Sequence, residues 1–487
     1  NVVVFDGTGP AGRPASVRVA GDTIVAVGDL EAARGETVVD GRGLALAPGF
    51  IDTHSHADAA IFSRRDALAA VSQGITTVVV GQDGGSPFPL ADFFRRLDSA
   101  PAAVNVASYA GHATLRLAVM GNDYRRPATA AELDRIRELL EADLAAGALG
   151  LSTGLEYDEG HSASTGEVLA LAKVAAAAGG RYISHIRSED RAFWPAIDEI
   201  IRIGRDAKLP VQISHLKLAM RSLWGRADTL VSRLDAARAE GVDITADIYP
   251  YTFWQSTLRV LFPERNYADP AAARFALTEV TTPEGVLMSQ WTLDPSYVGL
   301  TLAEIASRRG TDPITTLIDM ITESQEADSL AAARAGDQSH AAEVESIIAT
   351  SMAEPDVERL LRWEHANVCT DGELDGRHPR GFGAFAKVLG PYVRERSLFP
   401  VEEAVRKMTS LAARNAGIPN RGTIRPGAAA DLVLFDPALV ADRSTPTDPQ
   451  RPAAGVAMVW VNGEVVYQNG STTGRFPGRA LRRAGAR

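Results

Sequence analysis

The stretch that organises this chain reads Phe50-Ile51-Asp52-Thr53-His54-Ser55-His56-Ala57-Asp58. It follows the turn signal Pro48-Gly49, and its apolar start leads into two histidines spaced two residues apart. Residues two apart in a β-strand point to the same side, so we expect His54 and His56 to place two imidazoles side by side at a strand end. Imidazole is a good ligand for divalent transition metals. A chance His-x-His on a polar loop is the alternative, which the apolar lead-in and the flanking aspartates disfavour.

The bulk composition limits the kind of protein. A chain of 487 residues suits a large barrel with a small second domain better than one ordinary core. Its 50 basic and 61 acidic residues give a net charge of −11 and are interspersed, which argues against a nucleic-acid partner. No apolar run is long enough to predict a membrane span. The single cysteine, Cys369, excludes an internal disulfide and favours a cytoplasmic location.

Between residues 49 and 421, short apolar runs alternate with Ala- and Leu-rich stretches, which predicts parallel βα units. We expect eight strands, at residues 49–56, 75–83, 103–112, 148–155, 182–187, 211–217, 242–249 and 366–371. Eight such units form an α/β fold, the TIM-like (β/α)8 barrel, whose functional groups lie at the carboxyl ends of the strands. Polar residues of this chain fall at those ends: His54, His56, Asp83, His112, Tyr157, His185, His215, Tyr249 and Asp371.

Both ends of the chain predict short strands. Gly21-Asp22 near the start and Asn462-Gly463 near the end are tight-turn signals between apolar runs. The first strands alone would bury little surface, so we predict that residues 1–48 and 422–487 form one discontinuous β-sandwich beside a barrel domain at 49–421. The long gap before the last barrel strand predicts an insertion at about 260–360, with helices at 312–323 and 342–352. This insertion is either a lid over the active face or a structural excursion.

Two segments of similar sequence support a metal site. Ile183-Ser184-His185-Ile186-Arg187 and Ile213-Ser214-His215-Leu216-Lys217 both run from apolar residues into a histidine. With His54, His56, Asp83 and Asp371 they offer imidazoles and carboxylates for one or two zinc-like ions. Such an ion lowers the pKa of a bound water and polarises a carbonyl. Asp371 would be both ligand and proton carrier. These groups suit hydrolysis of a C–N or C–O bond without an organic cofactor.

Further motifs follow in order along the chain. They are Ala47-Pro48-Gly49-Phe50-Ile51-Asp52-Thr53-His54-Ser55-His56, Gly111-His112-Ala113-Thr114-Leu115-Arg116, Gly150-Leu151-Ser152-Thr153-Gly154-Leu155-Glu156-Tyr157, Tyr182-Ile183-Ser184-His185-Ile186-Arg187-Ser188-Glu189, Ile213-Ser214-His215-Leu216-Lys217, Ala246-Asp247-Ile248-Tyr249-Pro250-Tyr251, Thr370-Asp371-Gly372, His378-Pro379-Arg380 and Arg421-Gly422-Thr423-Ile424-Arg425-Pro426-Gly427. Together they resemble the D-aminoacylase (N-acyl-D-amino-acid deacylase) family of the amidohydrolase superfamily, over nearly the whole chain.

The resemblance implies a role for each matching residue. His185 and His215 would bind the tighter zinc, and His54, His56 and Asp371 would face a weaker second position. Asp371 would be the general acid and base. The substrate's α-carboxylate would be held by Lys217, Tyr249 and Arg380, with Tyr157 and Ser256 near the amide or carboxylate. The implied substrate is a small molecule, an N-acyl-D-amino acid or a dipeptide with a C-terminal D-residue; the D preference comes from the resemblance alone.

The chain departs from the family pattern after the second strand. The family usually has Gly-Asn-Cys-Gly where this chain has Gly81-Gln82-Asp83-Gly84. Asp83 therefore stands in place of a ligand cysteine, and a carboxylate is a harder ligand than a thiolate. The number and identity of the metal ions and the substrate stay open at this point.

The residues also suggest how an anionic substrate could be held. Lys217 lies two residues beyond His215, on the same strand face, and Arg380 can grip a carboxylate with two hydrogen bonds. A net-acidic protein needs such a local basic pocket to bind an N-acylated amino acid.

Two other functions compete with this interpretation. A cyclic-amide hydrolase resembling dihydroorotases and hydantoinases would often carry a carboxylated lysine on strand four. Here that strand reads Ala148-Leu149-Gly150-Leu151-Ser152-Thr153-Gly154 and has no lysine. A metal-free barrel that acts as a binding module is the other alternative, and the six candidate ligands argue against it.

Overall fold

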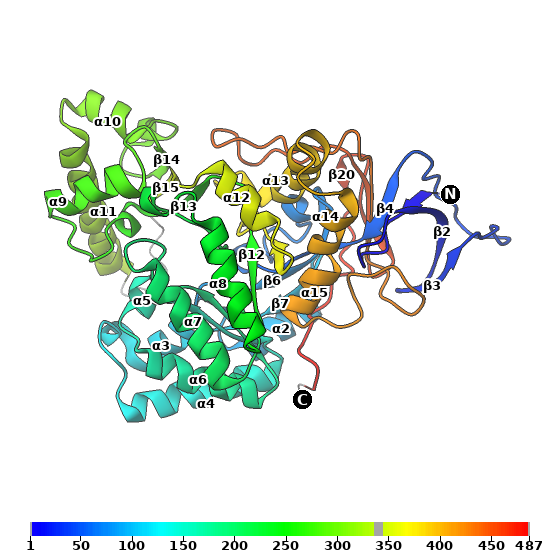
Figure 1. Cartoon of the computed structure of the whole chain (residues 1–487), viewed down its shortest axis with the longest axis horizontal. Coiled ribbons are helices and arrows are strands. Elements are labelled where there is room, and N and C mark those ends of the chain that lie inside the picture. Colours follow the sequence, from blue (N-terminus) through cyan, green and yellow to red (C-terminus); the bar gives the residue numbers. More distant parts are fainter. Residues whose placement is uncertain (1, 336–343, 486–487) are drawn as a thin grey trace.

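Buried parallel strands form the centre of the molecule (Figure 1). The structure is a computed structural model and describes residues 2–335 and 344–485. One sheet contains β5 (Phe50–Asp52), β6 (Ile75–Val80) and β7 (Asn105–Ser108). The other contains β8 (Ala110–Gly111), β9 (Gly150–Gly154), β10 (Arg181–His185), β11 (Val211–Ile213), β12 (Ile244–Ile248) and β16 (Ala366–Val368). All six residues of β6 are buried, as expected of a strand that is covered on both faces.

Hydrogen bonds join the margins of these two sheets. Only Tyr109 separates β7 from β8, and its N–H donates to the Val80 carbonyl at 3.0 Å. Beyond β5 and β16, the Asp371 N–H donates to the His54 carbonyl at 2.8 Å. The result is a TIM-barrel-like α/β fold in which each predicted strand overlaps an observed one. Among the described residues, the strand pairings form two separate sheets and do not close into a ring, so a closed barrel stays a prediction.

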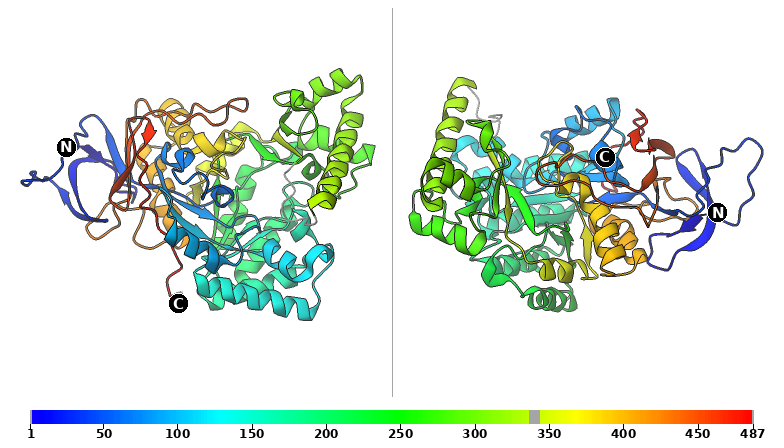
Figure 2. Two further views of the ribbon diagram at one scale, coloured as in Figure 1. Left: turned by 180° about the vertical axis from the view of Figure 1, so that it is seen from behind. Right: turned by 90° about the horizontal axis from the view of Figure 1, so that it is seen from above.

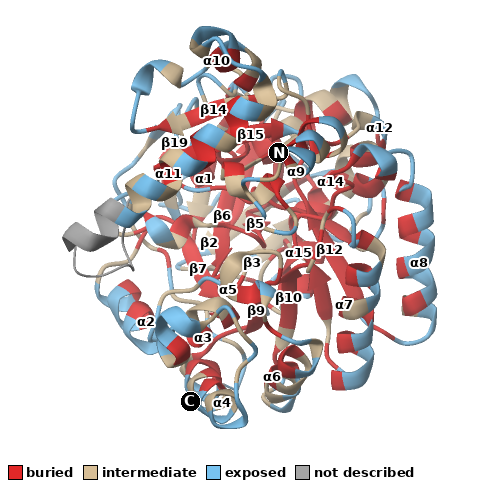
Figure 3. Ribbon diagram, turned by 90° about the vertical axis from the view of Figure 1, so that its left-hand side faces the viewer, coloured by how far each residue is buried: buried red, intermediate tan, exposed pale blue. Residues whose placement is uncertain are grey.

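Helices lie outside the parallel strands, and their inward faces are buried, as α8 shows in Figure 3. They are α1 (Leu68–Val71), α2 (Leu90–Ser99), α3 (His112–Met120), α4 (Ala130–Ala146), α5 (Asp158–His161), α6 (Thr165–Ala177), α7 (Phe193–Ala207), α8 (Ala227–Ala239), α12 (Glu354–Leu361), α13 (Arg380–Lys387), α14 (Val401–Met408) and α15 (Ser410–Ala416). The sequence sets their ends: α4 starts with a capping box of Thr129 and Glu132 and stops at Gly147, which has φ +119°. Across the described residues, no helix has the length and apolar character to span a bilayer.

The two chain ends meet in one eight-stranded sheet at the opposite end of the molecule from the insertion (Figures 1 and 2). Its order is β20 (Ser471–Thr472), β19 (Glu464–Gln468), β18 (Val456–Val461), β17 (Leu432–Phe435), β4 (Ala45–Pro48), β1 (Val2–Val4), β2 (Arg13–Ala20) and β3 (Thr23–Gly28). The predicted turns at Gly21-Asp22 and Asn462-Gly463 are confirmed, since they join β2 to β3 and β18 to β19. The pairing gives a single sheet, so the two-layered sandwich and the domain boundaries stay predictions.

The insertion differs from its prediction. It begins earlier than residue 260, with β13 (Phe253–Ser256), which forms a three-stranded antiparallel sheet with β15 (Glu345–Thr350) and β14 (Val286–Trp291). Helices α9 (Pro270–Phe275), α10 (Leu302–Arg309) and α11 (Pro313–Ala335) belong to it as well. The helix expected at 312–323 overlaps α11, which begins one residue later and continues to residue 335. The helix expected at 342–352 is wrong, because its described part contains strand β15; residues 342 and 343 lie outside the described residues.

Candidate active site

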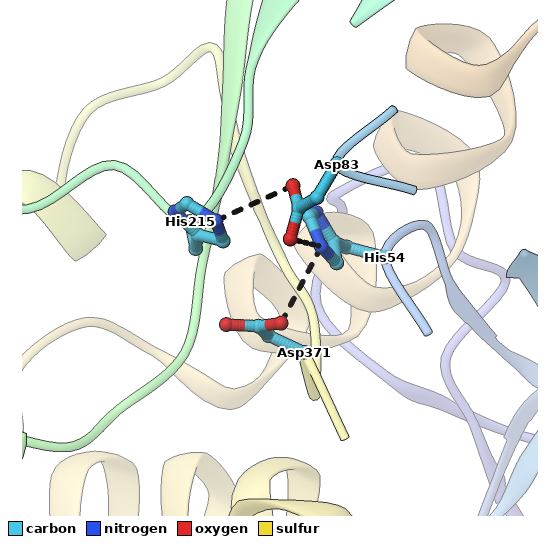
Figure 4. Close-up of side chains that lie close together, drawn as sticks. All are labelled: His54, Asp83, His215 and Asp371. Atoms are coloured by element: carbon cyan, nitrogen blue, oxygen red, sulfur yellow. Dashed lines mark ion pairs between the residues drawn. The ribbon is translucent and has the colours of Figure 1, made fainter. Parts of the chain in front are cut away.

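Four side chains from distant parts of the chain converge beyond the carboxyl ends of β5, β6, β11 and β16 (Figure 4). His54 Nε2 lies 3.3 Å from Asp83 Oδ2 and 3.4 Å from Asp371 Oδ1. His215 Nε2 lies 3.5 Å from Asp83 Oδ1. One potential ligand atom from each of the four falls within 4.8 Å of all the others. A single cation can therefore contact all four side chains.

The other two predicted ligands adjoin this cluster. His56 Nε2 is 3.2 Å from Asp371 Oδ1 and 3.5 Å from Asp83 Oδ2. His185 Nδ1 is 3.0 Å from His215 Nε2. Two nitrogens bound tetrahedrally at about 2.0–2.1 Å from one zinc ion lie roughly 3.3 Å apart, so the two imidazoles are spaced to share an ion. All six predicted ligands are brought together, while their role as ligands stays a prediction.

Unsatisfied polar atoms in the cluster fit a bound cation. Within the described part of the chain, neither ring nitrogen of the fully buried His54 has a hydrogen-bond partner, and the same holds for Asp83 Oδ1. Buried polar atoms without partners are costly and rare. Imidazole nitrogens and carboxylate oxygens are the donors that zinc accepts, so a zinc-like ion would satisfy these atoms.

The pKa values of two histidines also indicate a site for a cation. Burial lowers the pKa of His54, but Asp83, Asp247 and Asp371 outweigh it and hold this pKa well above its usual value. Burial likewise opposes the charged form of His56, yet Asp371 and Asp83 raise its pKa to about 10. The carboxylates of Asp83 and Asp371 therefore favour a positive charge beside them, which protonated His54 and His56 supply here. A metal ion would replace those protons.

Three members of the cluster adopt left-handed backbone conformations. The φ angles are +53° at Asp83, +35° at His215 and +48° at Asp371. Such a conformation costs a residue other than glycine about 1–3 kcal/mol and is concentrated at functional sites. Each of the three lies in the loop after its strand, so the predicted strands run past the observed ends. The turn in each loop aims the side chain back toward the others.

A cavity of about 560 Å³ adjoins the cluster and is lined by all the predicted substrate residues, which are Tyr157, Lys217, Tyr249, Ser256 and Arg380. Arg380 Nη1 lies 2.6 Å from Asp371 Oδ2, and its guanidinium carbon is 4.9 Å from the Tyr249 ring centre. The Tyr249 hydroxyl and Arg380 Nε are buried and have no hydrogen-bond partner among the described residues. These donors are free to bind an anionic group.

The remaining predicted substrate residues surround this pair of donors. Lys217 Nζ lies 2.7 Å from His215 Nδ1 and also contacts the Glu189 carboxylate. The Tyr157 ring lies 4.5 Å from that of His185, and Ser256 ends β13 of the insertion. His112, in contrast, is not part of the cluster, and its Nε2 lies 3.0 Å from Glu167 Oε1.

Sequence reasoning missed three residues that hold the site in place. Glu156 Oε2 lies 2.8 Å from His185 Nε2, the ring nitrogen that faces away from His215. Glu189 contacts Lys217 and lies 3.2 Å from His215 Nδ1. His378 Nδ1 accepts a 2.9 Å hydrogen bond from the Arg380 N–H. All three lie inside the motifs quoted in the sequence analysis. Their closeness in sequence to predicted site residues was the signal that could have identified them.

Comparison with known proteins places the chain in a family. It matches the model of the amidohydrolase family over residues 37–467. It is 38% identical to D-aminoacylase of Alcaligenes xylosoxydans xylosoxydans, across 99% of this chain and 96% of that protein. It is also 38% identical to N-acyl-D-glutamate deacylase of the same organism, across 99% of this chain and 95% of that protein.

A solved structure agrees with these matches. It is N-acyl-D-glutamate deacylase from Bordetella bronchiseptica, complexed with zinc and a phosphonate inhibitor that mimics the tetrahedral intermediate of the reaction. It superposes with a TM-score of 0.86 at 36% identity, covering 99% of this chain and 98% of that one. Matches of this extent in both sequence and structure lead to one conclusion: the chain belongs to the amidohydrolase family.

Proposed function

We propose that the chain is a zinc-dependent hydrolase of linear amides. It converts an N-acyl-D-amino acid, or a dipeptide with a C-terminal D-residue, and water into a carboxylate and a D-amino acid. The observation that carries this proposal is the His/Asp cluster of Figure 4 beside a cavity in which the buried Tyr249 hydroxyl and Arg380 Nε find no hydrogen-bond partner among the described residues. The full-length similarity to D-aminoacylase and N-acyl-D-glutamate deacylase supports the substrate class.

The metal site uses the predicted ligands. His185 and His215 would hold one zinc ion with Asp83, and His54, His56 and Asp371 would face a second position. When bound, zinc lowers the pKa of a water molecule and polarises the amide carbonyl. We extend the proposal to a closed (β/α)8 barrel as the scaffold, because the Asp371 N–H and the His54 carbonyl already link the first and last strands.

Asp371 moves the proton. Burial opposes its ionisation, but Arg380 and the His215 and His54 imidazoles outweigh burial and keep its pKa below the usual range. It is therefore a carboxylate that can accept a proton from the attacking water as the oxygen bonds to the acyl carbon. When the C–N bond breaks, Asp371 returns that proton to the leaving nitrogen. The amino acid leaves as an amine, and the acyl group as a carboxylic acid.

The α-carboxylate of the substrate is held by Arg380, Lys217 and Tyr249. The guanidinium and ammonium supply charge, and the Tyr249 hydroxyl supplies a buried donor. Fixing both this carboxylate and the amide at the zinc leaves one orientation of the α-carbon substituents. That constraint lets the pocket distinguish the D from the L enantiomer.

The alternative functions find less support. β9, at the position of strand four, consists of Gly150–Gly154 and offers no lysine to be carboxylated, unlike many cyclic-amide hydrolases. The converging ligands of Figure 4 argue against a metal-free binding module.

Substrate class is tested by a stereochemical screen. Purified protein with measured zinc content is assayed on matched N-acetyl-D- and N-acetyl-L-amino acids and on dihydroorotate and a hydantoin. We expect release of D-amino acids at least 100-fold faster than of L-amino acids. Only one enantiomer can place its α-carboxylate at Arg380, Lys217 and Tyr249 and its amide at the zinc at the same time. Faster turnover of the cyclic amides would refute the proposal.

Glu156 is expected to strengthen zinc binding. Its carboxylate holds the His185 nitrogen that faces away from the metal site, and loss of such a contact typically weakens metal affinity about 10- to 100-fold. The measurement is zinc affinity of Glu156→Gln by competition with a chromophoric chelator. Glu138→Gln, on the exposed face of α4, is the matched control. Equal affinity in both variants would show that Glu156 does not support the metal.

A further inference from the structure

A second cavity borders the metal cluster. Its volume is about 930 Å³, and His56, Asp83 and Glu373 line both it and the cavity that contains Arg380. Lys217, Tyr249 and Arg380 line only the first cavity. The His/Asp cluster therefore lies where two cavities meet, and only one of them carries the carboxylate-binding residues.

The second cavity has an apolar wall from the loop after β5 and from α2. Phe62 and Phe93 lie with their ring centres 5.7 Å apart, edge to face. The Arg96 guanidinium lies 3.7 Å from the centre of the Phe62 ring and covers it. Ala59 and Pro87 add further apolar lining, and the rest of the cavity is lined by polar residues that include Ser63, Gln82, Ser86 and Thr114. We call the cavity lined by Ala59, Phe62, Pro87 and Phe93 the acyl groove.

Hydrolysis of a linear amide requires room on both sides of the bond that breaks. The amino-acid half carries an α-carboxylate, so it occupies the cavity with Lys217 and Arg380. The acyl half must leave the metal cluster in another direction. Asp58 and Glu373 also line the acyl groove, and their carboxylates disfavour an anionic acyl group there. The one guanidinium of the lining, Arg96, lies over the Phe62 ring. An uncharged acyl chain packed on the Phe62 and Phe93 side of the cavity fits this lining best.

We propose that the acyl groove binds the hydrocarbon part of the N-acyl group, so that the enzyme prefers aliphatic or aromatic acyl groups longer than acetyl. This inference rests on the proposed function. Each methylene fully transferred from water to an apolar wall raises kcat/KM by up to about fourfold. Over the four methylenes between acetyl and hexanoyl, we expect at least a tenfold gain, since the groove is partly open to solvent.

The experiment narrows the groove at Gly85, which lines it. A Cβ at this position would meet only the Gln82 carbonyl oxygen, at 3.7 Å, an ordinary contact. Gly85→Leu is therefore expected to fold, and its side chain takes up space in the groove. A second variant, Phe62→Ala, removes part of the apolar wall. Gly166→Leu at the start of α6 is the matched control, since a Cβ there would meet only Ser164 Oγ at 3.7 Å.

The readout is the ratio of kcat/KM for N-hexanoyl- to N-acetyl-D-amino acid with the same D-residue. We expect both groove variants to lower this ratio about tenfold and Gly166→Leu to leave it unchanged. A wild-type ratio of one or less, or a ratio that neither groove variant changes, overturns the acyl groove and leaves the proposed function standing. Zinc-loaded protein that hydrolyses no N-acyl-D-amino acid overturns both.

Discussion

Replacing Asp371 with asparagine is expected to lower kcat for N-acyl-D-amino acids by about 100- to 10,000-fold, the usual contribution of a general acid or base. Asparagine has nearly the same shape and tolerates the left-handed conformation at this position, where φ is +48°. An amide cannot accept the proton of the attacking water. Proton transfer is thus lost without rebuilding the loop after β16.

The measurement combines kcat with zinc content and thermal unfolding, which separate lost chemistry from lost metal or lost fold. Asp375→Asn is the matched control, because Asp375 is exposed in the same loop region and does not line the cavity. Turnover of Asp371→Asn equal to that of this control, with zinc bound in both proteins, would remove Asp371 from the reaction.

Arg380→Met is expected to lower kcat/KM about 30- to 100-fold more for N-acyl-D-amino acids than for their neutral carboxamide analogues. The guanidinium is buried, and its Nε has no hydrogen-bond partner among the described residues. Hydrogen bonds to charged groups contribute about 1.5–3 kcal/mol each. Loss of such a bond weakens binding of a carboxylate more than that of a neutral amide.

Comparing two substrates on one variant removes a complication. Arg380 Nη1 also contacts Asp371 at 2.6 Å, so the substitution can alter the proton carrier, but that effect applies to both substrates. Arg377→Met, an exposed arginine three residues earlier, controls for the lost charge. Equal losses on the carboxylate and the carboxamide substrate would show that Arg380 does not bind the α-carboxylate.

The positions of the parallel strands were predictable because apolar runs recur between Ala-rich helices, and each run overlaps an observed strand. The residues at which the strands end were not predictable. Asp83, His215 and Asp371 lie in left-handed turns just after their strands, and the alternation of apolar and polar residues along a strand does not indicate such a turn. Their convergence could still be predicted, because parallel strands bring their carboxyl ends to one side of the sheet.

The insertion shows where local pattern fails. Residues 342–352 begin Ala-Glu and suggest a helix, yet Ile347 and Ile348 lie in strand β15, between β13 and β14. Pairing with two strands distant in sequence overrides the weak local preference. Glu156 and Glu189 escaped prediction for a related reason. Glutamate is usually solvent-exposed. The adjacency of β9 and β10 places Glu156 beside His185, whereas Glu189 follows His185 by four residues in the loop after β10.

Asp83, which stands where the sequence resemblance implies a cysteine, has a practical consequence. A carboxylate does not form sulfenic or sulfinic acids, so peroxide has no sulfur to attack among the proposed ligands. The one thiol of the chain, Cys369, is fully buried. Thiol-directed reagents should therefore leave the proposed metal ligands unmodified, and we expect the protein to keep its activity without a reducing agent.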